Sequence, residues 1–437
     1  MNSRVETSIH FEVAPLRALV DEPVTISLSG LVPGQPVTLW AHTRNASDEE
    51  WTSSASFVAD ERGALDLATQ RPITGSYHGV DPMGLFWSMR PVSKQVPALF
   101  LTDPCEPVEI ELIAEIDGTA IGGARLQRLF AADGVRGEFV QEQGLVGAFY
   151  RPSDSGPSPA VIILSGSDGS QRESQAALLA SRGYAALTLR YFGAEGLPES
   201  LVHIPLEYFE TAIHWLQARS EVQSDNIGVI GLSRGGELAL LLGATFPTIK
   251  AVVACSPSGL VQAGLERGYS RSAWTYHGKP LQQAVVRWTP LLWFKVMGQL
   301  MKQRAFPLRD LFLSTLKDRK HLDEATIPVE KIQGPILLIS GDDDQMFPST
   351  VFSERIMRRL TEHHHPYADQ HLHYQGAGHF VSFPYGFPYL PPFVKRVQGL
   401  AVGGTIVDTA ASVADSWPKI LAFFKEALTA RTSPPVV

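Results

Sequence analysis

The chain has 437 residues, of which 44% are hydrophobic and 19% charged, and its formal net charge is -8. This length allows two or three domains with a large buried core, and the composition is typical of a globular protein. The acidic balance and the lack of a basic stripe exclude a general nucleic-acid-binding role. The two cysteines, Cys105 and Cys255, exclude a disulfide framework and a cysteine-based metal cluster.

The ends of the chain and its hydropathy predict a cytoplasmic protein without a membrane span. Residues 1–7 lack the apolar core of a signal peptide, and no run of eighteen apolar residues occurs. Residues 433–437 do not form a peroxisomal address. A reducing cytoplasm fits these features and the low cysteine content.

Residues 1 to about 120 predict a β-sandwich domain. The segments 24–28 and 37–41 alternate between apolar and polar residues, and a turn at 33–36 separates them. The segment 108–112 alternates again, and short strands at this spacing are typical of a sandwich. Because no catalytic constellation stands out here, we expect a packing or recognition domain.

From about residue 121 to residue 437, strands and helices alternate, which predicts a mostly parallel, doubly wound α/β sheet. Helices are expected at about 173–182, which Gly183 ends, and at 208–219. Short apolar runs, typical of strands buried on both faces, occur at 160–164, 185–189, 227–230, 251–254 and 336–340.

An aromatic-rich insertion, at about 260–330, separates the last two of these strands. An insertion at the carboxyl ends of such strands usually covers the active site. We expect its apolar side chains either to line a pocket for a hydrocarbon chain or to pack the insertion onto the sheet. They include Trp274, Tyr276, Trp288, Trp293, Phe294, Met297, Met301, Phe306 and Phe312.

Ser233 is the predicted nucleophile, within the G-x-S-x-G pattern of residues 231–235. The pattern alone is weak, but it directly follows the strand 227–230 and opens an apolar helix at 237–244. This strand–turn–helix placement is that of the nucleophile elbow of an α/β-hydrolase. The strained turn requires residues without bulk on both sides of the serine, and glycines supply them.

The oxyanion that forms during attack is expected to lie at the N-terminus of this helix, where the helix dipole favours negative charge. The backbone N–H of Arg234 is the first predicted donor. The second is expected from the loop 165–169, which follows the strand 160–164, and Ser167 is the best candidate.

A serine hydroxyl needs a base, and the base needs an orienting carboxylate; in this fold the chain order is Ser, Asp, His. The strand 336–340 is followed by three aspartates, Asp342, Asp343 and Asp344. We choose Asp344 as the triad acid and expect the other two to cap the loop or face solvent. The predicted base is His379, in a glycine-rich loop after the last expected strand, 371–374.

Five further histidines precede this loop, but the sequence predicts no metal site and no cofactor. His363, His364 and His365 indicate a solvated helix end, and His371 and His373 alternate along the last strand. No cysteine or glutamate at ligand spacing accompanies them, so zinc coordination is not expected.

Several longer strings resemble the acyl-CoA thioesterase/bile acid-CoA:amino acid N-acyltransferase family. They lie at 19–24, 79–88 and 327–336, and the resemblance covers nearly the whole chain. It implies a β-sandwich followed by an α/β-hydrolase domain, with Ser233, Asp344 and His379 as the triad. Two features depart from the family's pattern: the loop 165–169 has fewer glycines, and the Pro-Tyr after His379 lacks a neighbouring acidic residue.

The resemblance also implies the reaction. In this family the thioesterases use serine and the transferases to glycine or taurine use cysteine, so Ser233 implies hydrolysis of an acyl-CoA through an acyl-enzyme. The alternatives are an acyltransferase or a carboxylesterase with the same triad, in a biosynthetic or detoxifying pathway, and a non-enzymatic binding protein. The expected ligand is a small acyl thioester or ester. Cations expected to flank the site are Arg172, Arg190, Arg234, Arg271 and Lys279.

Overall fold

The computed structural model of the chain divides by its contacts into two compact units. The first comprises Met1–Ala132 with Phe387–Phe393, and the second comprises Asp133–Gly386 with Val394–Val437. The structure describes residues 8–93, 100–103, 106–153, 156–266, 270–301, 305–317, 320–392, 396–397 and 399–429.

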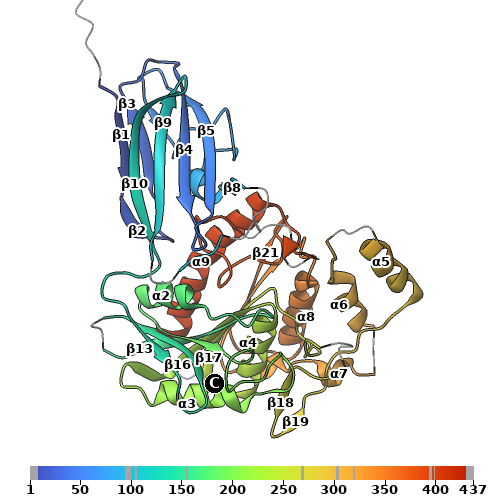
Figure 1. Ribbon diagram of the computed structural model, residues 1–437. Helices are drawn as coiled ribbons and strands as arrows, with labels where there is room; N and C mark the ends of the chain where they lie inside the picture. Colours follow the sequence, from blue (N-terminus) through green and yellow to red (C-terminus); the bar gives the residue numbers. More distant parts are fainter. Residues whose placement is uncertain are drawn as a thin grey trace, which may run out of the picture. The chain divides into compact units, whose positions relative to one another are not determined.

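The first unit is built from two β-sheets (Figure 1). Its longest central strands bury every second residue, as the alternating sequence predicts. The smaller sheet has the order β1 (His10–Ala14), β3 (Thr25–Ser29), β6 (Leu65–Asp66). The larger has the order β2 (Arg17–Leu19), β10 (Thr119–Leu129), β9 (Val108–Ile116), β4 (Pro36–Arg44), β5 (Glu50–Val58), β7 (Thr74–Gly75), with β8 (Arg90–Pro91) also on β5; the short α1 covers Gly84–Trp87.

Strand β10 continues the first unit beyond the boundary predicted near residue 120. It pairs antiparallel with β9 in the larger sheet and ends at Leu129. Most of its side chains are exposed or half-buried, and Gly122 and Gly123 interrupt it, so its sequence lacks the alternation of a half-buried strand. The contact division accordingly falls after Ala132.

The second unit contains an eight-stranded sheet in the order β11-β12-β14-β13-β16-β17-β20-β21. Strand β12 is antiparallel to β11 and β14, and all the later pairings are parallel. This order, with one early antiparallel strand, defines an α/β-hydrolase sheet and confirms the predicted fold. The strands are β11 (Arg136–Val140), β12 (Val146–Arg151), β13 (Ser158–Leu164), β14 (Ala185–Arg190), β16 (Val222–Leu232), β17 (Ile249–Cys255), β20 (Ile336–Gly341) and β21 (Gln370–Tyr374).

Helices flank this sheet, and all seven residues of β13 are buried, as expected for a strand covered on both faces. Helix α4 packs on β16 and β17, α8 on β20, and α9 on β16, β17 and β20 (Figure 1). The helices are α2 (Glu173–Ser181), α3 (Glu207–Gln217), α4 (Arg234–Thr245), α8 (Ser349–Glu362) and α9 (Ile406–Thr429). None of the helices in the described part of the chain combines the length and apolar character that crossing a bilayer requires.

The insertion predicted at 260–330 consists of short elements. Trp274 is fully buried in the core, and the ring of Phe312 lies tilted against that of Phe347, so these two aromatic residues follow the packing alternative. Trp288 and Phe294, by contrast, are 57% and 68% exposed. The elements are β18 (Trp274–Tyr276), which pairs with β15 (Ile204–Pro205), β19 (Lys279–Pro280), α5 (Pro290–Met301), α6 (Arg309–Thr315), α7 (Leu322–Ala325) and a 3-10 turn, η1 (Val329–Lys331); β22 (Arg396–Val397) and β23 (Leu400–Ala401) form a later ribbon.

Candidate active site

The three predicted triad residues lie at one edge of the second unit's sheet. Ser233 follows β16, Asp344 lies just past β20, and His379 lies in the loop after β21. These strands run parallel, so their carboxyl ends meet at the same edge. The sheet therefore places these three residues, which are far apart in the sequence, at the same edge.

Ser233 has the strained backbone of a nucleophile elbow. Its φ of 61° and ψ of -119° lie in a region that residues with a side chain rarely adopt. The surrounding residues must be glycines, because a side chain at either position would collide with the backbone. A Cβ at Gly231 would lie 2.2 Å from the Gly235 carbonyl oxygen, and one at Gly235 would lie 2.4 Å from the Ser165 carbonyl oxygen. The turn thus holds the serine between a strand and a helix that approach too closely for any side chain at these glycines.

Arg234, predicted to supply an oxyanion donor through its backbone N–H, directly follows Ser233. Arg234 is the first residue of α4, and the first N–H groups of a helix have no partner within it. Ser167 is exposed, in the loop that follows β13. The neighbouring Gly166 N–H donates to the Tyr385 hydroxyl at 2.7 Å and is therefore occupied.

The Arg234 side chain turns away from this role into a buried ion pair. Its Nη1 lies 3.0 Å from Glu237 Oε2, and both side chains are almost fully buried. Glu237 Oε1 also accepts hydrogen bonds from Trp274 Nε1 at 2.8 Å and from the Gln262 N–H at 3.0 Å. Burial lowers the pKa of Arg234, opposed by Glu237, and burial raises the pKa of Glu237, opposed by Arg234. The pair fastens the insertion to the helix that begins at the nucleophile.

This pairing changes the set of cations available to an anionic ligand. Arg234 is committed to Glu237, Arg172 pairs with Asp168, and Arg271 pairs with Glu266. Lys279, in β19, is exposed. Three of the five cations expected to flank the site are thus held by carboxylates.

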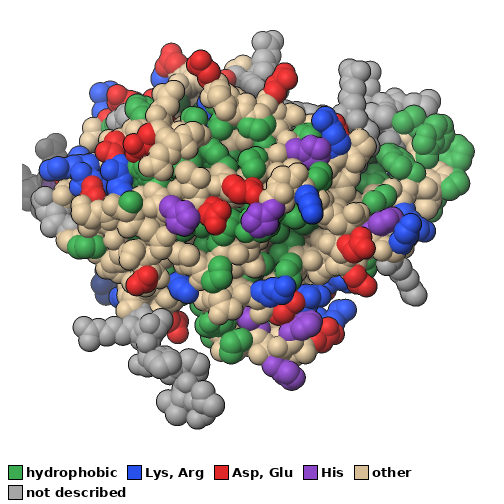
Figure 2. Space-filling model, turned by 90° about the horizontal axis from the view of Figure 1, so that it is seen from below, with side chains coloured by type: hydrophobic (Ala, Val, Ile, Leu, Met, Phe, Trp, Pro, Cys, Tyr) green, Lys and Arg blue, Asp and Glu red, His purple; other side chains and the backbone are tan. Residues whose placement is uncertain are grey.

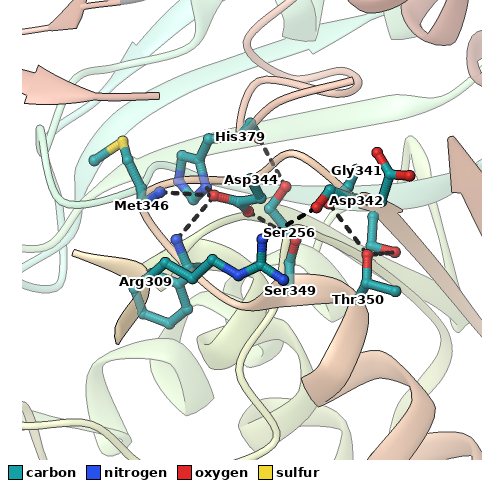
Figure 3. A network of polar contacts seen from close by, with 11 residues as sticks. Ser256, Arg309, Gly341, Asp342, Asp344, Met346, Ser349, Thr350 and His379 are labelled. Atoms are coloured by element: carbon teal, nitrogen blue, oxygen red, sulfur yellow. Dashed lines mark hydrogen bonds and ion pairs between the residues drawn. The ribbon is translucent and has the colours of Figure 1, made fainter. Parts of the chain in front are cut away.

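Asp344 and His379 form a buried acid–base pair (Figure 3). The Nδ1 atom of His379 lies 3.0 Å from Oδ1 and 2.9 Å from Oδ2 of Asp344, and both side chains are 1% exposed. The carboxylate also accepts the N–H of Met346 at 3.0 Å, the N–H of Phe347 at 2.8 Å and the Ser349 hydroxyl at 2.7 Å. Both of its oxygens are therefore fixed toward the imidazole.

The other two aspartates of this loop have different partners, none of them His379. Asp342 Oδ1 accepts the N–H of Gly376 at 2.7 Å, and Asp343 Oδ2 accepts the N–H of Gly404 at 2.7 Å. Both carboxylates therefore stabilise neighbouring loops, as expected of loop-capping groups.

The end of β17 connects the histidine with the serine. The Ser233 N–H donates to the Cys255 carbonyl at 2.8 Å. The next residue, Ser256, donates its hydroxyl to the His379 carbonyl at 2.7 Å (Figure 3). Two consecutive residues thus hold the nucleophile and the base to one strand end. The sequence gives no signal for Ser256 beyond its position after a strand.

Tyr385 is a second residue that the sequence did not single out as functional. Besides accepting the Gly166 N–H, its hydroxyl donates to Asp168 Oδ1, and the Arg172 guanidinium lies 3.5 Å from its ring centre. Arg172 Nη2 in turn lies 2.5 Å from Asp168 Oδ2. The loop that should carry the second oxyanion donor is therefore clamped to the segment after His379. The signal was present in the Pro-Tyr pair that matches the family's pattern.

The histidines before the site differ from one expectation. His363 and His364 are exposed at the end of α8, but the side chain of His365 is only 1% exposed. The prediction of a solvated helix end is wrong for His365, because its Nδ1 pairs with Asp369 at 2.6 Å and its Nε2 contacts the Ile332 carbonyl at 2.9 Å. In the described ranges, no group of three His, Cys, Asp or Glu side chains is placed to hold a metal ion.

The strand order, the elbow at Ser233 and the buried Asp344–His379 pair define the class of this protein as an α/β-hydrolase. Residues 204–430 match the family described as BAAT / Acyl-CoA thioester hydrolase C terminal, and residues 21–142 match the Acyl-CoA thioester hydrolase/BAAT N-terminal region. The chain belongs to this family, as the resemblance predicts.

Similar proteins align with the chain along nearly its whole length. Acyl-coenzyme A amino acid N-acyltransferase 1 of Mus musculus is 34% identical, covering 95% of this chain and 96% of its own. Acyl-coenzyme A thioesterase 1 of Mus musculus is 31% identical, covering 94% and 95%. Among solved structures, a putative dienelactone hydrolase from Klebsiella pneumoniae matches 67% of this chain and 100% of its own, with 15% identity and a TM-score of 0.41.

Proposed function

We propose that this chain hydrolyses acyl-CoA thioesters to a free acid and CoA through an acyl-enzyme on Ser233. The observation that carries the proposal is the Asp344–His379 pair, buried at the same sheet edge as a strained serine elbow. Relatives about one-third identical over nearly the whole chain are named acyl-coenzyme A thioesterases and N-acyltransferases, which supports an acyl-CoA substrate.

In the proposed reaction, His379 accepts the proton of the Ser233 hydroxyl through Nε2, and the serine oxygen attacks the thioester carbonyl. The C–S bond then breaks, and His379 returns the proton to the departing thiolate. A water molecule then gives a proton to the same histidine and attacks the acyl-enzyme carbonyl; the C–O bond to Ser233 breaks, and His379 returns the proton to the serine oxygen. Asp344 keeps Nδ1 protonated and stabilises the imidazolium that forms twice in each cycle.

The oxyanion of each tetrahedral intermediate is proposed to lie between two backbone donors, the N–H groups of Arg234 and Ser167. The N-terminus of α4 adds its positive dipole end at this position. Since these donors belong to the fold and need no rearrangement, they stabilise the charged intermediate more than the neutral substrate.

A second candidate function is acyl transfer from CoA to an amino acid. It is favoured by the two N-acyltransferases of Mus musculus, which are 34% and 33% identical to this chain. Water is the preferred acceptor in our proposal because the nucleophile is a serine, the residue that the resemblance associates with thioesterases. We also propose a cytoplasmic location, although relatives include proteins named as mitochondrial and peroxisomal.

The experiment that tests the proposal measures thiol release from acyl-CoAs of graded chain length. Ser233→Ala should lower kcat at least about ten-thousandfold, because the remaining groups cannot form the acyl-enzyme. Ser353→Ala is the matched control, since this buried serine lies on α8 and is expected to leave the rate unchanged.

Two further arms separate the alternatives. Added glycine or taurine should leave the rate of free-acid formation unchanged, and p-nitrophenyl esters should be cleaved more slowly than acyl-CoAs. Near-wild-type turnover by Ser233→Ala on every substrate would contradict the proposed nucleophile. Formation of an N-acyl amino acid would instead support the transferase.

A further inference from the structure

The insertion contains one helix that faces solvent and one that packs inward. In α5, Leu291 and Phe294 are 79% and 68% exposed, and hydrophobic side chains gather at the right-hand margin of Figure 2, where α5 lies in Figure 1. In α6, by contrast, Leu311 and Thr315 are buried. Of these two helices, α6 is therefore the one that packs on the rest of its unit.

Phe312 of α6 reaches the acid–base pair through one aromatic residue, Phe347. The ring centres of Phe312 and Phe347 lie 4.1 Å apart, with 30° between their planes. The ring centre of Phe347 lies 6.1 Å from that of the His379 imidazole, and its backbone N–H donates to Asp344 Oδ1 at 2.8 Å. Phe347, which is buried, therefore contacts the acid, the base and the insertion at once.

The apolar cluster around Phe347 comes mostly from the insertion. Among the residues that the structure describes, all its members except Phe347 and Phe352 lie between residues 260 and 330. The insertion therefore has a small apolar core, and Phe347 is the residue of the acid loop that enters it. The other members are Leu260, Ala284, Phe312, Leu316, Leu322 and Ala325.

Arg309, at the start of α6, bonds to the acid loop (Figure 3). Its backbone N–H donates to the Gln345 carbonyl at 3.0 Å, and its Nη1 donates to the Asp342 carbonyl at 3.4 Å. These two acceptors flank Asp344 in the sequence. The hydrogen bonds thus fix where α6 begins, and Phe312 follows about one helical turn later.

The segment before α6 bonds in a similar way to the chain that supports His379. The Phe306 N–H donates to the Gly399 carbonyl at 2.9 Å, and the Ala401 N–H donates to the Phe306 carbonyl at 3.0 Å. The next residue, Val402, accepts the His379 N–H at 2.9 Å. Through residues 306–312, the insertion is therefore bonded on both sides of the acid–base pair.

The backbone hydrogen bonds of this segment need no particular side chain, but the ring contact needs Phe312. Loss of this ring would leave a cavity beside Phe347, and neighbouring groups relax into such a cavity only in part. A shift of Phe347 would move a hydrogen-bond donor of Asp344 and the ring beside His379. Misplacement of a catalytic group by about 1 Å can lower a rate about a hundredfold.

We propose that Phe312 is a positioning residue for the reaction: its ring holds Phe347 against the His379 imidazole, and through this contact the insertion fixes the acid–base pair. The inference rests on the proposed function, since it concerns the proton transfers assigned to His379. It gives the insertion a part in setting the geometry of the pair, beyond any role in covering the site.

The test compares Phe312→Ala, Phe312→Leu and wild type in thiol release from acyl-CoA. Phe312→Ala should lower kcat about ten- to a hundredfold and leave KM within about twofold, because Phe312 acts on the pair and not on the substrate. Acylation and deacylation should slow together, since His379 acts in both. Phe312→Leu keeps most of the apolar volume and should retain at least about one-third of the wild-type kcat.

Phe246→Ala is the matched control. Phe246 is 6% exposed at the end of α4, and its ring centre lies 6.1 Å from that of Tyr276. Loss of this buried ring should lower Tm at least as much as Phe312→Ala does, but it should leave kcat within about twofold. Circular dichroism verifies that every variant is folded.

Wild-type kcat in Phe312→Ala, or an equal loss of kcat in Phe246→Ala, would overturn the proposal. A raised KM for long-chain acyl-CoA with kcat retained would also overturn it, because Phe312 would then line the site of the acyl chain.

Failure of the proposed function is scored separately, as an absence of thiol release by wild type. The rate at which a fluorophosphonate probe labels Ser233 then decides the inference, because labelling needs the triad but no CoA. Phe312→Ala should be labelled at least about tenfold more slowly than wild type and Phe246→Ala at the wild-type rate. Equal labelling of Phe312→Ala and wild type would overturn the proposal, and no labelling of wild type would overturn both proposals.

Discussion

On the acid–base side of the site, both oxygens of Asp344 are bonded to groups within five residues, namely two backbone N–H groups of their own loop and Ser349, the first residue of α8. On the side proposed for the oxyanion, the loop 165–169 is bonded instead to Tyr385, 219 positions beyond Gly166. The first arrangement is local and needs only the right residues after β20. The second is not local, because it requires the segment after His379 to return across the end of β13.

The two sides of the site therefore differ in the sequence range of the contacts that fix their geometry. The carboxylate has five contacts, so loss of any one of them leaves the imidazole with a partner. The loop 165–169 is held by Tyr385, by the Asp168–Arg172 ion pair and by the Tyr191 hydroxyl, which donates to the Ser165 carbonyl at 2.5 Å. Burial raises the pKa of Tyr385, partly offset by Arg172, so its hydroxyl stays protonated and donates to Asp168. Substitutions on the two sides should therefore have separable effects.

The largest effect is expected from Asp344→Asn, which tests the acid–base side. The amide cannot hold the charged imidazolium and favours the wrong tautomer, so kcat should fall by about three to four orders of magnitude. The matched control is Asp343→Asn, which changes the neighbouring carboxylate of the same loop. This variant should lower kcat by less than about tenfold. Thiol-release kinetics measure both. A larger loss in Asp343→Asn would break the assignment of the triad acid.

A smaller effect is expected from Tyr385→Phe, which tests the oxyanion side. The change leaves the Gly166 N–H and Asp168 without the hydroxyl, so the loop should relax and kcat should fall by about ten- to a hundredfold with little change in KM. Tyr374→Phe is the control, because its hydroxyl also bonds a carboxylate, Asp415, at 2.7 Å but lies outside the loop. Equal losses of kcat in both variants would show that Tyr385 has no special link to the reaction.

The smallest effect concerns the free energy of unfolding. It tests the His365–Asp369 pair, which lies on neither side of the site. Burial lowers the pKa of His365, but the hydrogen bonds that its ring donates to Asp369 and to the Ile332 carbonyl raise it above 6.5 overall. Because the pKa is higher in the folded state, the pair stabilises fully below about pH 6.5 and loses this contribution as pH rises through the folded-state pKa. His365→Gln should cost roughly 1–3 kcal/mol at acid pH and less at alkaline pH.

Thermal unfolding of His365→Gln and wild type across this pH range measures the difference. The exposed neighbour His363 supplies the control, and His363→Gln should leave Tm unchanged at every pH. A gap between His365→Gln and wild type that stayed constant with pH would contradict a charged pair. Unchanged kcat in His365→Gln would show that this pair contributes to stability and not to the reaction.

The sequence was most informative where the chemistry is local. The hydrolase sheet follows from apolar runs, and the elbow follows from glycines whose absent side chains the turn requires. The partners of Asp342 and Asp343 could not be derived, because they are backbone N–H groups that only the fold brings near, those of Gly376 and Gly404. Burial of His365 was missed for the same reason, since Asp369 and Ile332 reach it only after α8 packs on η1.

The glycines around the elbow also limit how this site can evolve. Gly231 and Gly235 each face a backbone oxygen at less than 2.5 Å from any added Cβ, and at Gly236 the gap is 2.7 Å. The turn therefore does not accommodate a side chain at these glycines, whereas residue 233 already carries one that fits. Exchange of oxygen for sulfur there keeps the shape of the turn and alters only the attacking atom. A lineage can therefore move between serine and cysteine chemistry by one substitution while the scaffold stays constant.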